Sequence, residues 1–298
     1  MKFDLVLTNP PFQDRLKRGK TPHKLWIDFT RSVFDRLLVD DGLLCQVSPS
    51  SFQSPSNKVL TLMKENSTEW IDFDTDKHFP EVGSTFANYA IRKSPRNGTR
   101  TEVLDGNGAF RVALDDQVFY LPNDLCEEAL SIHRKVVFDS SPKLEVEHDY
   151  VTCHNIILRT GSSLSREKTD EHVYPVFHTN RQIWWSSVRQ EFANKKKVMW
   201  TRSGYTKPFY DSGKLGATDM GYFVLVPSAS DGKALAHNMS LKLMQYIFTT
   251  AKWSGFGNER VFESLPALPA GRSLRDDELY AHFELTTKEV EHVERCVG

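Results

Sequence analysis

The feature that most constrains the fold of this 298-residue chain is a short apolar segment that ends in two prolines. Residues 3–8 have the composition of a buried parallel strand, and Asn9-Pro10-Pro11-Phe12 follows at once. Proline lacks an N–H and has a fixed φ, so this loop is stiff and cannot continue a sheet ladder. Open α/β sheets bind their ligands at the carboxyl ends of strands. The sequence therefore predicts an α/β fold with a site at residues 9–12.

The residue types in this loop suit a planar ligand that carries an amino group. The side-chain carbonyl of Asn9 and the backbone carbonyls beside Pro10 and Pro11 are acceptors that can hold both hydrogens of an exocyclic amine. The ring of Phe12 offers a face on which a base can stack. The alternative interpretation is an ordinary Pro-rich turn between a strand and a helix, with Phe12 in the core.

Asn9-Pro10-Pro11-Phe12 resembles the catalytic motif of amino-group DNA methyltransferases, in the form typical of N6-adenine enzymes. The same tetrapeptide type occurs in methyltransferases that act on glutamine side chains and on RNA. The resemblance implies that Asn9 and the Pro10 carbonyl accept hydrogen bonds from the amine of a flipped adenine. That nitrogen then attacks the methyl group of S-adenosylmethionine, with no metal and no covalent intermediate. Catalysis by such a site rests on positioning and polarisation.

The pattern that follows the loop predicts half of a doubly wound sheet. Apolar residues recur at three- and four-residue spacing from Leu25, which predicts a helix to about Asp40, ended by Gly42. The expected elements after it are a strand at 43–47, a helix at 56–65, and strands at 70–73 and 85–92. We therefore expect a partial Rossmann-like methyltransferase sheet in residues 1–109.

Two further segments resemble restriction-type adenine methyltransferases. Residues 42–52 are similar to the strand after the catalytic loop, and residues 78–86 are similar to the segment that supplies a second aromatic edge to the flipped base. By that match Phe79 is the candidate for stacking on the base together with Phe12, and Phe86 is a weaker alternative. The other interpretation of Phe79 is a hydrophobic plug at a strand entrance.

The second half of the chain has the composition of a DNA-binding domain. Residues 94–108 read as a linker or exposed hairpin, and beyond them the pattern becomes short, irregular and aromatic. Between Arg181 and Gly216 there are eight Lys and Arg residues against two acids. Cations neutralise phosphates, and aromatic planes pack on sugars or bases. The candidate DNA contacts are Lys195, Lys196, Lys197, Arg202 and Lys207, although a lysine run is more often a solvated surface.

The segments around these cations resemble the target-recognition domains of the same restriction–modification methyltransferases. This match implies a mixed α+β target-recognition domain at residues 110–271, followed by an acidic helical segment at residues 272–298. Double-stranded DNA is the partner that this domain implies.

Composition adds a cellular context. No apolar stretch reaches the roughly 20 residues of a membrane span, and the first residues lack the pattern of a signal peptide. The four cysteines are scattered, with neither metal-ligand spacing nor a disulfide framework. A cytoplasmic location is the expectation.

The sequence shows no element that would bind the methyl donor. In the gamma motif order that the chain resembles, a Gly-rich half comes before the catalytic loop, but nothing precedes Lys2 except Met1. We therefore expect a separate protein partner to supply the S-adenosylmethionine-binding half. The alternative is a non-catalytic DNA-binding or assembly subunit, or a remnant of such a methyltransferase.

Overall fold

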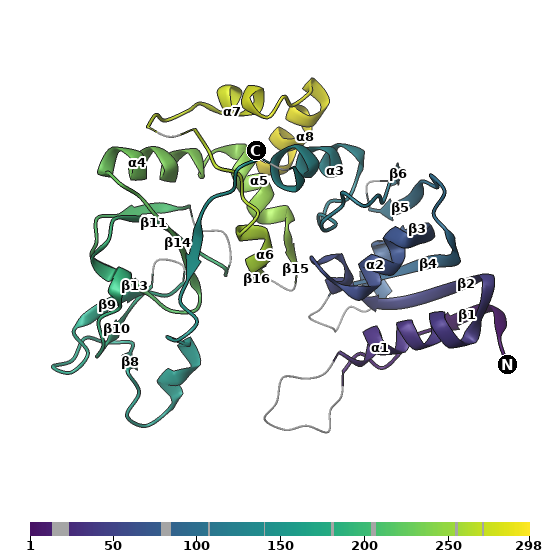
Figure 1. Ribbon diagram of the computed structural model, residues 1–298, viewed down its shortest axis with the longest axis horizontal. Helices are drawn as coiled ribbons and strands as arrows, with labels where there is room; N and C mark the ends of the chain where they lie inside the picture. Colours follow the sequence, from purple (N-terminus) through teal and green to yellow (C-terminus); the bar gives the residue numbers. More distant parts are fainter. Residues whose placement is uncertain are drawn as a thin grey trace. The chain divides into compact units, whose positions relative to one another are not determined.

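The chain divides into two compact units, residues 1–134 and 135–298, and each is described by itself (Figure 1). The computed structural model describes residues 1–13, 24–78, 85–106, 108–139, 141–179, 182–203, 207–253, 256–269 and 271–298. The first unit ends at Arg134, and the segment after residue 100 adds two strands to its sheet.

The first unit is built on a six-stranded mixed sheet. Its strands are β1 (Phe3–Thr8), β2 (Leu38–Pro49), β3 (Asn66–Asp72), β4 (Phe86–Pro95), β5 (Thr101–Asp105) and β6 (Gly108–Val112). Their order is β1-β2-β4-β3-β5-β6, with β1 parallel to β2 and β3 parallel to β5, while the other neighbours are antiparallel. The predicted fold class, an α/β sheet unit followed by a mixed α+β unit, is confirmed.

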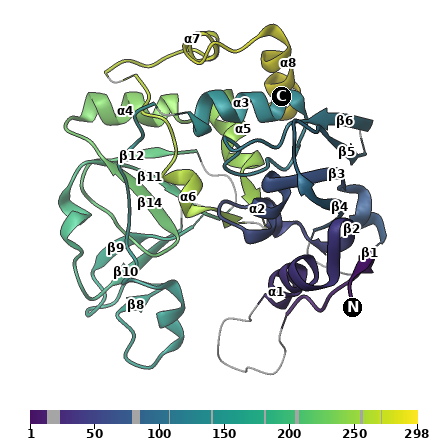
Figure 2. The ribbon, with the colours of Figure 1, turned by 45° about the vertical axis from the view of Figure 1, so that its right-hand side comes forward.

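Helices α1 (Leu25–Ser32) and α2 (Lys58–Glu65) lie beside each other against this sheet (Figure 2). The buried side chains of α1 are Trp26 and Thr30. The side chain of Asn57 caps α2 by accepting a hydrogen bond from the backbone N–H of Val59 at 2.9 Å. Helix α3 (Glu127–His133) closes the first unit.

The structure corrects the expected role of Gly42. The helical segment ends earlier than expected, with a π-helical turn over Val33–Leu37, and β2 begins at Leu38. Gly42 therefore lies inside a strand, directly after Asp41, whose φ is 64°. A Cβ on Gly42 would lie 2.9 Å from the carbonyl oxygen of Val39 and 3.2 Å from that of Phe3. Glycine is needed here for close backbone approach rather than to end a helix.

One face of the sheet is covered by α1 and the other is open at β1. Along β1, Phe3, Leu5 and Leu7 are 42%, 51% and 72% exposed. Leu5 pairs with Leu43 and Leu7 pairs with Cys45 on β2, where both partners are half-buried. We call Leu5, Leu7, Leu43 and Cys45 the open sheet face. β1 and β2 pair in parallel, and parallel strands normally have both faces covered, so this exposed apolar surface is available to a partner.

The second unit combines two four-stranded sheets with short helices. The first sheet, in the order β13-β9-β10-β8, comprises β8 (Leu164–Ser165), β9 (Tyr174–Phe177), β10 (Ile183–Ser186) and β13 (Gly216–Ala217). The second, in the order β12-β11-β14-β7, comprises β7 (Val146–His148), β11 (Lys197–Thr201), β12 (Phe209–Asp211) and β14 (Gly221–Leu225). Phe177, Met199, Ala217 and Phe223 form a buried cluster with members from both sheets.

Helices complete the second unit. They are α4 (Ala229–Asn238), α5 (Lys242–Thr250), α6 (Glu259–Phe262), α7 (Asp276–His282) and α8 (Thr287–Val297), and a two-stranded sheet joins β15 (Lys252–Trp253) to β16 (Phe256–Gly257). α7 and α8 lie in the expected acidic helical segment at 272–298. Within the described part of the chain, every helix is too short or too polar to cross a bilayer.

Candidate functional site

The loop Asn9-Pro10-Pro11-Phe12 lies at the carboxyl end of β1, as the sequence predicts for a ligand loop. β1 ends at Thr8, which pairs with Gln46 of the parallel strand β2. In the loop, Asn9 and Pro11 are exposed, Pro10 is buried and Phe12 is half-buried. The buried proline fixes the loop to the sheet, while the amide of Asn9 remains accessible to a ligand.

Two other strands bring residues to the same end of the sheet. β2 ends at Pro49, which pairs with Phe86 at the start of the antiparallel strand β4. The backbone N–H of Ser50 extends this pairing by donating to the carbonyl of Thr85 at 2.9 Å. The loop after β1 therefore lies at the same end of the sheet as the end of β2 and the beginning of β4.

Phe12 packs against Phe86 at this end of the sheet. The ring centroids are 5.1 Å apart and the ring planes are inclined by 38°. Phe86 is only 3% exposed, so its ring supports Phe12 and has little free surface on which a base could stack. Phe79, the first candidate for the second aromatic, lies outside the described residues. The weaker candidate, Phe86, is thus the described aromatic that the fold brings to Phe12.

A buried polar network lies behind the loop, and the sequence analysis did not identify it. The Nε2 atom of Gln46 donates to Oγ1 of Thr30 at 2.7 Å and to the hydroxyl of Tyr89 at 2.8 Å. Thr30 in turn donates to the carbonyl of Trp26 at 2.6 Å. Burial raises the pKa of Tyr89, so this hydroxyl stays protonated. The network joins α1 to β2 and β4 and holds the strand that pairs with Thr8 in one position.

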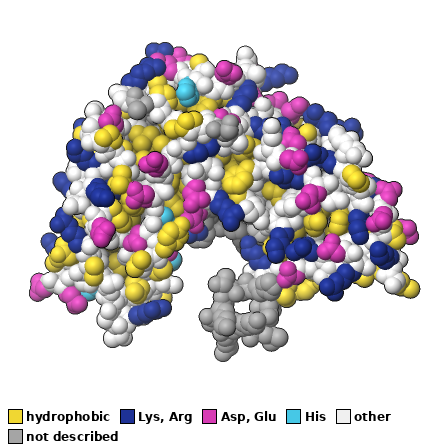
Figure 3. Space-filling model, viewed as in Figure 1, with side chains coloured by type: hydrophobic (Ala, Val, Ile, Leu, Met, Phe, Trp, Pro, Cys, Tyr) yellow, Lys and Arg dark blue, Asp and Glu magenta, His cyan; other side chains and the backbone are white. Residues whose placement is uncertain are grey.

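The structure separates the candidate DNA-binding cations into two kinds. Lys195, Lys196 and Lys207 are exposed, and Arg202 is half-buried directly after β11. Figure 3 shows Lys and Arg side chains interspersed with Asp and Glu over the visible face, rather than gathered into one basic patch.

Lys197 is a correction, because its side chain is 0% exposed and cannot contact a phosphate in this fold. Its Nζ donates to Oδ2 of Asp211 at 2.8 Å and to the carbonyls of Phe192 and Lys195. The Asp211 carboxylate also accepts the backbone N–H groups of the turn that follows it. Lys197 is therefore a structural residue at the start of β11.

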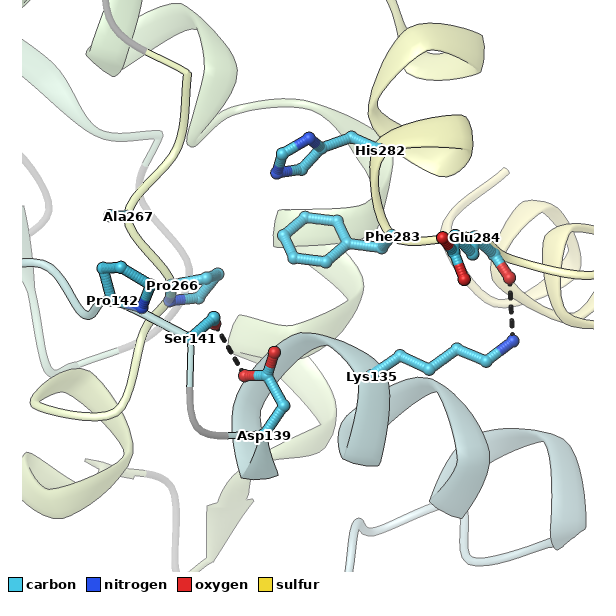
Figure 4. Close-up of a pocket in the computed structure, with 9 residues that line it drawn as sticks. All are labelled: Lys135, Asp139, Ser141, Pro142, Pro266, Ala267, His282, Phe283 and Glu284. Atoms are coloured by element: carbon cyan, nitrogen blue, oxygen red, sulfur yellow. Dashed lines mark hydrogen bonds between the residues drawn. The ribbon is translucent and has the colours of Figure 1, made fainter.

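A pocket of about 440 Å³ lies elsewhere in the second unit (Figure 4). The rings of Phe283, Pro142 and Pro266 line it, and its volume is within the range of small-ligand sites. Lys135 donates to the carbonyl of Glu284 at 2.9 Å, and Asp139 accepts from Ser141 at 2.7 Å. Because these charged groups are already engaged by the pocket wall, we assign the pocket no ligand.

Comparison with known proteins gives a distant likeness of fold. No family model matches the chain, and no curated protein does. Among solved structures, the type IIL restriction–modification enzyme MmeI in complex with DNA is similar, with a TM-score of 0.49 and 9% identity over 89% of this chain and 46% of that one. The ATP-dependent type ISP restriction–modification enzyme LlaBIII bound to DNA has a TM-score of 0.47 and 10% identity over 94% of this chain and 29% of that one. The chain spans less than half the length of either enzyme, and we draw no function from likeness at these scores.

Proposed function

We propose that this chain is the catalytic and target-recognition part of a DNA methyltransferase that modifies the N6 amine of adenine. The observation that carries the proposal is the position of Asn9-Pro10-Pro11-Phe12 at the carboxyl end of β1, with Phe12 against Phe86. The loop combines exposed amine acceptors with an aromatic wall at one end of the sheet. A restriction–modification role and a cytoplasmic location accord with this activity.

In the proposed reaction, Asn9 and Pro10 orient the amine of an adenine that has been flipped out of the duplex. The Asn9 side-chain carbonyl and the Pro10 backbone carbonyl each accept one amine hydrogen, so the nitrogen lone pair is directed out of the plane of the base. The ring of Phe12 holds the base plane by stacking. The buried ring of Pro10 keeps the two acceptors at a fixed spacing, which lowers the entropy cost of reaching the reactive geometry.

The described residues of this chain do not fit the methyl donor, S-adenosylmethionine. A donor cradle of the Rossmann type needs a glycine-rich turn between a strand and the following helix. The described glycines of the first unit instead lie within β2 and β6 or in the turns that join β4 to β5 and β5 to β6. We therefore assign no donor-binding residue to this chain.

We propose that a second polypeptide covers the open sheet face and binds the donor. Leu5 and Leu7 lie on β1, the outermost strand of the sheet, whose outer edge faces no described strand. An exposed apolar edge strand is an aggregation hazard unless another chain pairs with it. A strand added beside β1 would also lie next to the Asn9 loop, where the donor must meet the amine.

This part of the proposal predicts a selective effect of a charge at Leu7. Leu7→Asp should abolish association with the second polypeptide, because the change places a carboxylate on an apolar contact. The free chain should remain folded, since Leu7 is 72% exposed. Leu158→Asp is the matched control, because Leu158 is 82% exposed in the other unit. Co-purification from the natural source measures association, and equal recovery with both variants would refute this interface.

For the second unit we propose DNA binding through Lys195, Lys196, Lys207 and Arg202. Each phosphate that a cation neutralises adds about −0.9 to the slope of log K against log salt concentration. Replacing Lys195 and Lys196 with alanine should therefore weaken binding to all sequences alike and make the slope shallower by about 2. Arg202→Ala should relax specificity at one base position if that side chain reaches a base edge. An unchanged slope in the double-lysine variant would place the DNA path elsewhere.

A non-catalytic DNA-binding or assembly subunit is the competing function, and the lack of a donor cradle in the described residues favours it. Calorimetry of S-adenosylmethionine with the chain, alone and with its co-purifying polypeptide, separates the two. Binding only in the presence of the second polypeptide supports the divided enzyme. Absence of binding in both samples supports the non-catalytic subunit.

A further inference from the structure

Two histidines of the second unit are held side by side with their Nδ1 atoms engaged. His154 begins the 3-10 turn His154–Leu158, and His178 follows β9. Their ring centroids are 5.8 Å apart. Neither Nε2 atom has a hydrogen-bond partner among the described residues.

Asp219 fixes the tautomer of His154. The Nδ1 atom lies 3.0 Å from both carboxylate oxygens of Asp219, so it carries the proton and donates. The backbone N–H of His154 also donates to this carboxylate, at 2.6 Å. In the neutral ring, Nε2 is then a hydrogen-bond acceptor. The side chain is 45% exposed, which leaves this acceptor open to a ligand.

Thr218 fixes the opposite tautomer of His178. The Thr218 side chain is fully buried, and its Oγ1 accepts the backbone N–H of Met220 at 3.3 Å. Its hydroxyl hydrogen needs an acceptor, and Nδ1 of His178, at 2.9 Å, is the one within the described residues. His178 therefore carries its proton on Nε2 and is a donor there. Burial and the neighbouring His154 lower the pKa of His178 to about 4, so the ring is neutral at physiological pH.

His178 is 8% exposed, so a small part of its ring reaches solvent. The ring stacks on Trp184 with centroids 3.7 Å apart, which holds its orientation. The guanidinium of Arg166 lies 5.9 Å from the centre of the Trp184 ring and adds a positive charge beside the pair.

We propose that His154 and His178 together read an adenine edge in the major groove of the target DNA. Adenine presents the N7 acceptor next to the N6 amine donor, whereas guanine presents two acceptors, N7 and O6. One donor and one acceptor are what an Asn or Gln amide offers to adenine. Here two imidazoles held in opposite tautomers supply the donor and the acceptor. His178 donates to N7, and His154 accepts from the N6 amine. The inference rests on the proposed DNA binding by this unit. The adenine recognised here remains in the duplex and is distinct from the flipped adenine proposed at the Asn9 loop.

The test uses the full chain with its co-purifying polypeptide and a randomised duplex pool, followed by binding to single duplexes. We expect one position with a strong adenine preference. There, 7-deazaadenine removes the partner of His178, and purine, which lacks the amine, removes the partner of His154. Each analogue removes one of the two hydrogen bonds and should weaken wild-type binding by about 2- to 12-fold. His154→Ala should be insensitive to purine but still sensitive to 7-deazaadenine, while Lys196→Ala should weaken binding to every duplex equally.

The outcomes are distinguishable from those of the proposed function. Because the analogues leave the protein unchanged, a folding defect in a histidine variant cannot imitate their effect. DNA binding with a base preference that neither the analogues nor His154→Ala alters would overturn this inference alone. Absence of any DNA binding by the wild-type protein would overturn the proposed function, and this inference with it.

Discussion

Replacing Asn9 with alanine is expected to reduce the methylation rate of the assembled enzyme by about 100-fold or more. The side-chain carbonyl is one of two acceptors proposed to hold the amine, and loss of one such transition-state hydrogen bond has effects of this size. DNA affinity should change little, because Asn9 lies in the first unit while the proposed phosphate contacts lie in the second. Single-turnover methylation and equilibrium DNA binding measure the two effects separately.

Asn9→Asp is the matched variant, because it keeps an acceptor oxygen but loses the amide. It should retain more activity than Asn9→Ala if acceptance from the amine is the function of this residue. Equal loss in both variants would mean that the amide N–H₂ matters and that the assigned role is incorrect. Normal turnover in Asn9→Ala would remove the loop from the reaction.

The second large effect concerns stability and separates Lys197 from its neighbours in sequence. Lys197→Met is expected to lower the free energy of unfolding by about 3–5 kcal/mol, because it leaves the Asp211 carboxylate buried without its ion pair. Lys196→Met is the control and should change stability by no more than about 0.5 kcal/mol, since Lys196 is exposed. Urea unfolding of both variants measures the difference.

A second substitution tests the cause. Lys197→Met combined with Asp211→Asn removes both buried charges, keeps an oxygen that can accept the N–H groups of the turn, and should recover part of the lost stability. If Lys197→Met and Lys196→Met are equally stable, the ion pair with Asp211 contributes little to the free energy of unfolding and the structural role assigned to Lys197 is wrong.

The position of the Asn9-Pro10-Pro11-Phe12 loop at the end of β1 was predictable because its determinants are local. An apolar run and two prolines define the end of β1 without reference to any other part of the chain. The alternation and helical spacing that locate β2, α2 and β4 are equally local properties.

The sequence did not predict contacts between residues that lie far apart along the chain. The sequence alone does not distinguish Lys197 from Lys195 and Lys196. The pairing of β11 with β12 places Asp211 beside Lys197 and so provides its ion-pair partner. The Phe12–Phe86 contact depends on the antiparallel pairing of β2 with β4.

The histidine pair shows the same limit. His154 and Asp219 are 65 residues apart, and His178 and Thr218 are 40 residues apart. No local pattern brings these four side chains together, because their positions depend on sheet and loop contacts across the second unit.

The most direct test of the central claim is the chemical identity of the product. The protein, isolated from its natural source together with any polypeptide that co-purifies with it, is incubated with duplex DNA and methyl-labelled S-adenosylmethionine. The DNA is then digested to nucleosides for mass spectrometry. We expect the label in N6-methyldeoxyadenosine from the wild-type protein and none from Asn9→Ala. Label in a cytosine derivative or in protein, or equal adenine methylation by the variant, would contradict the account.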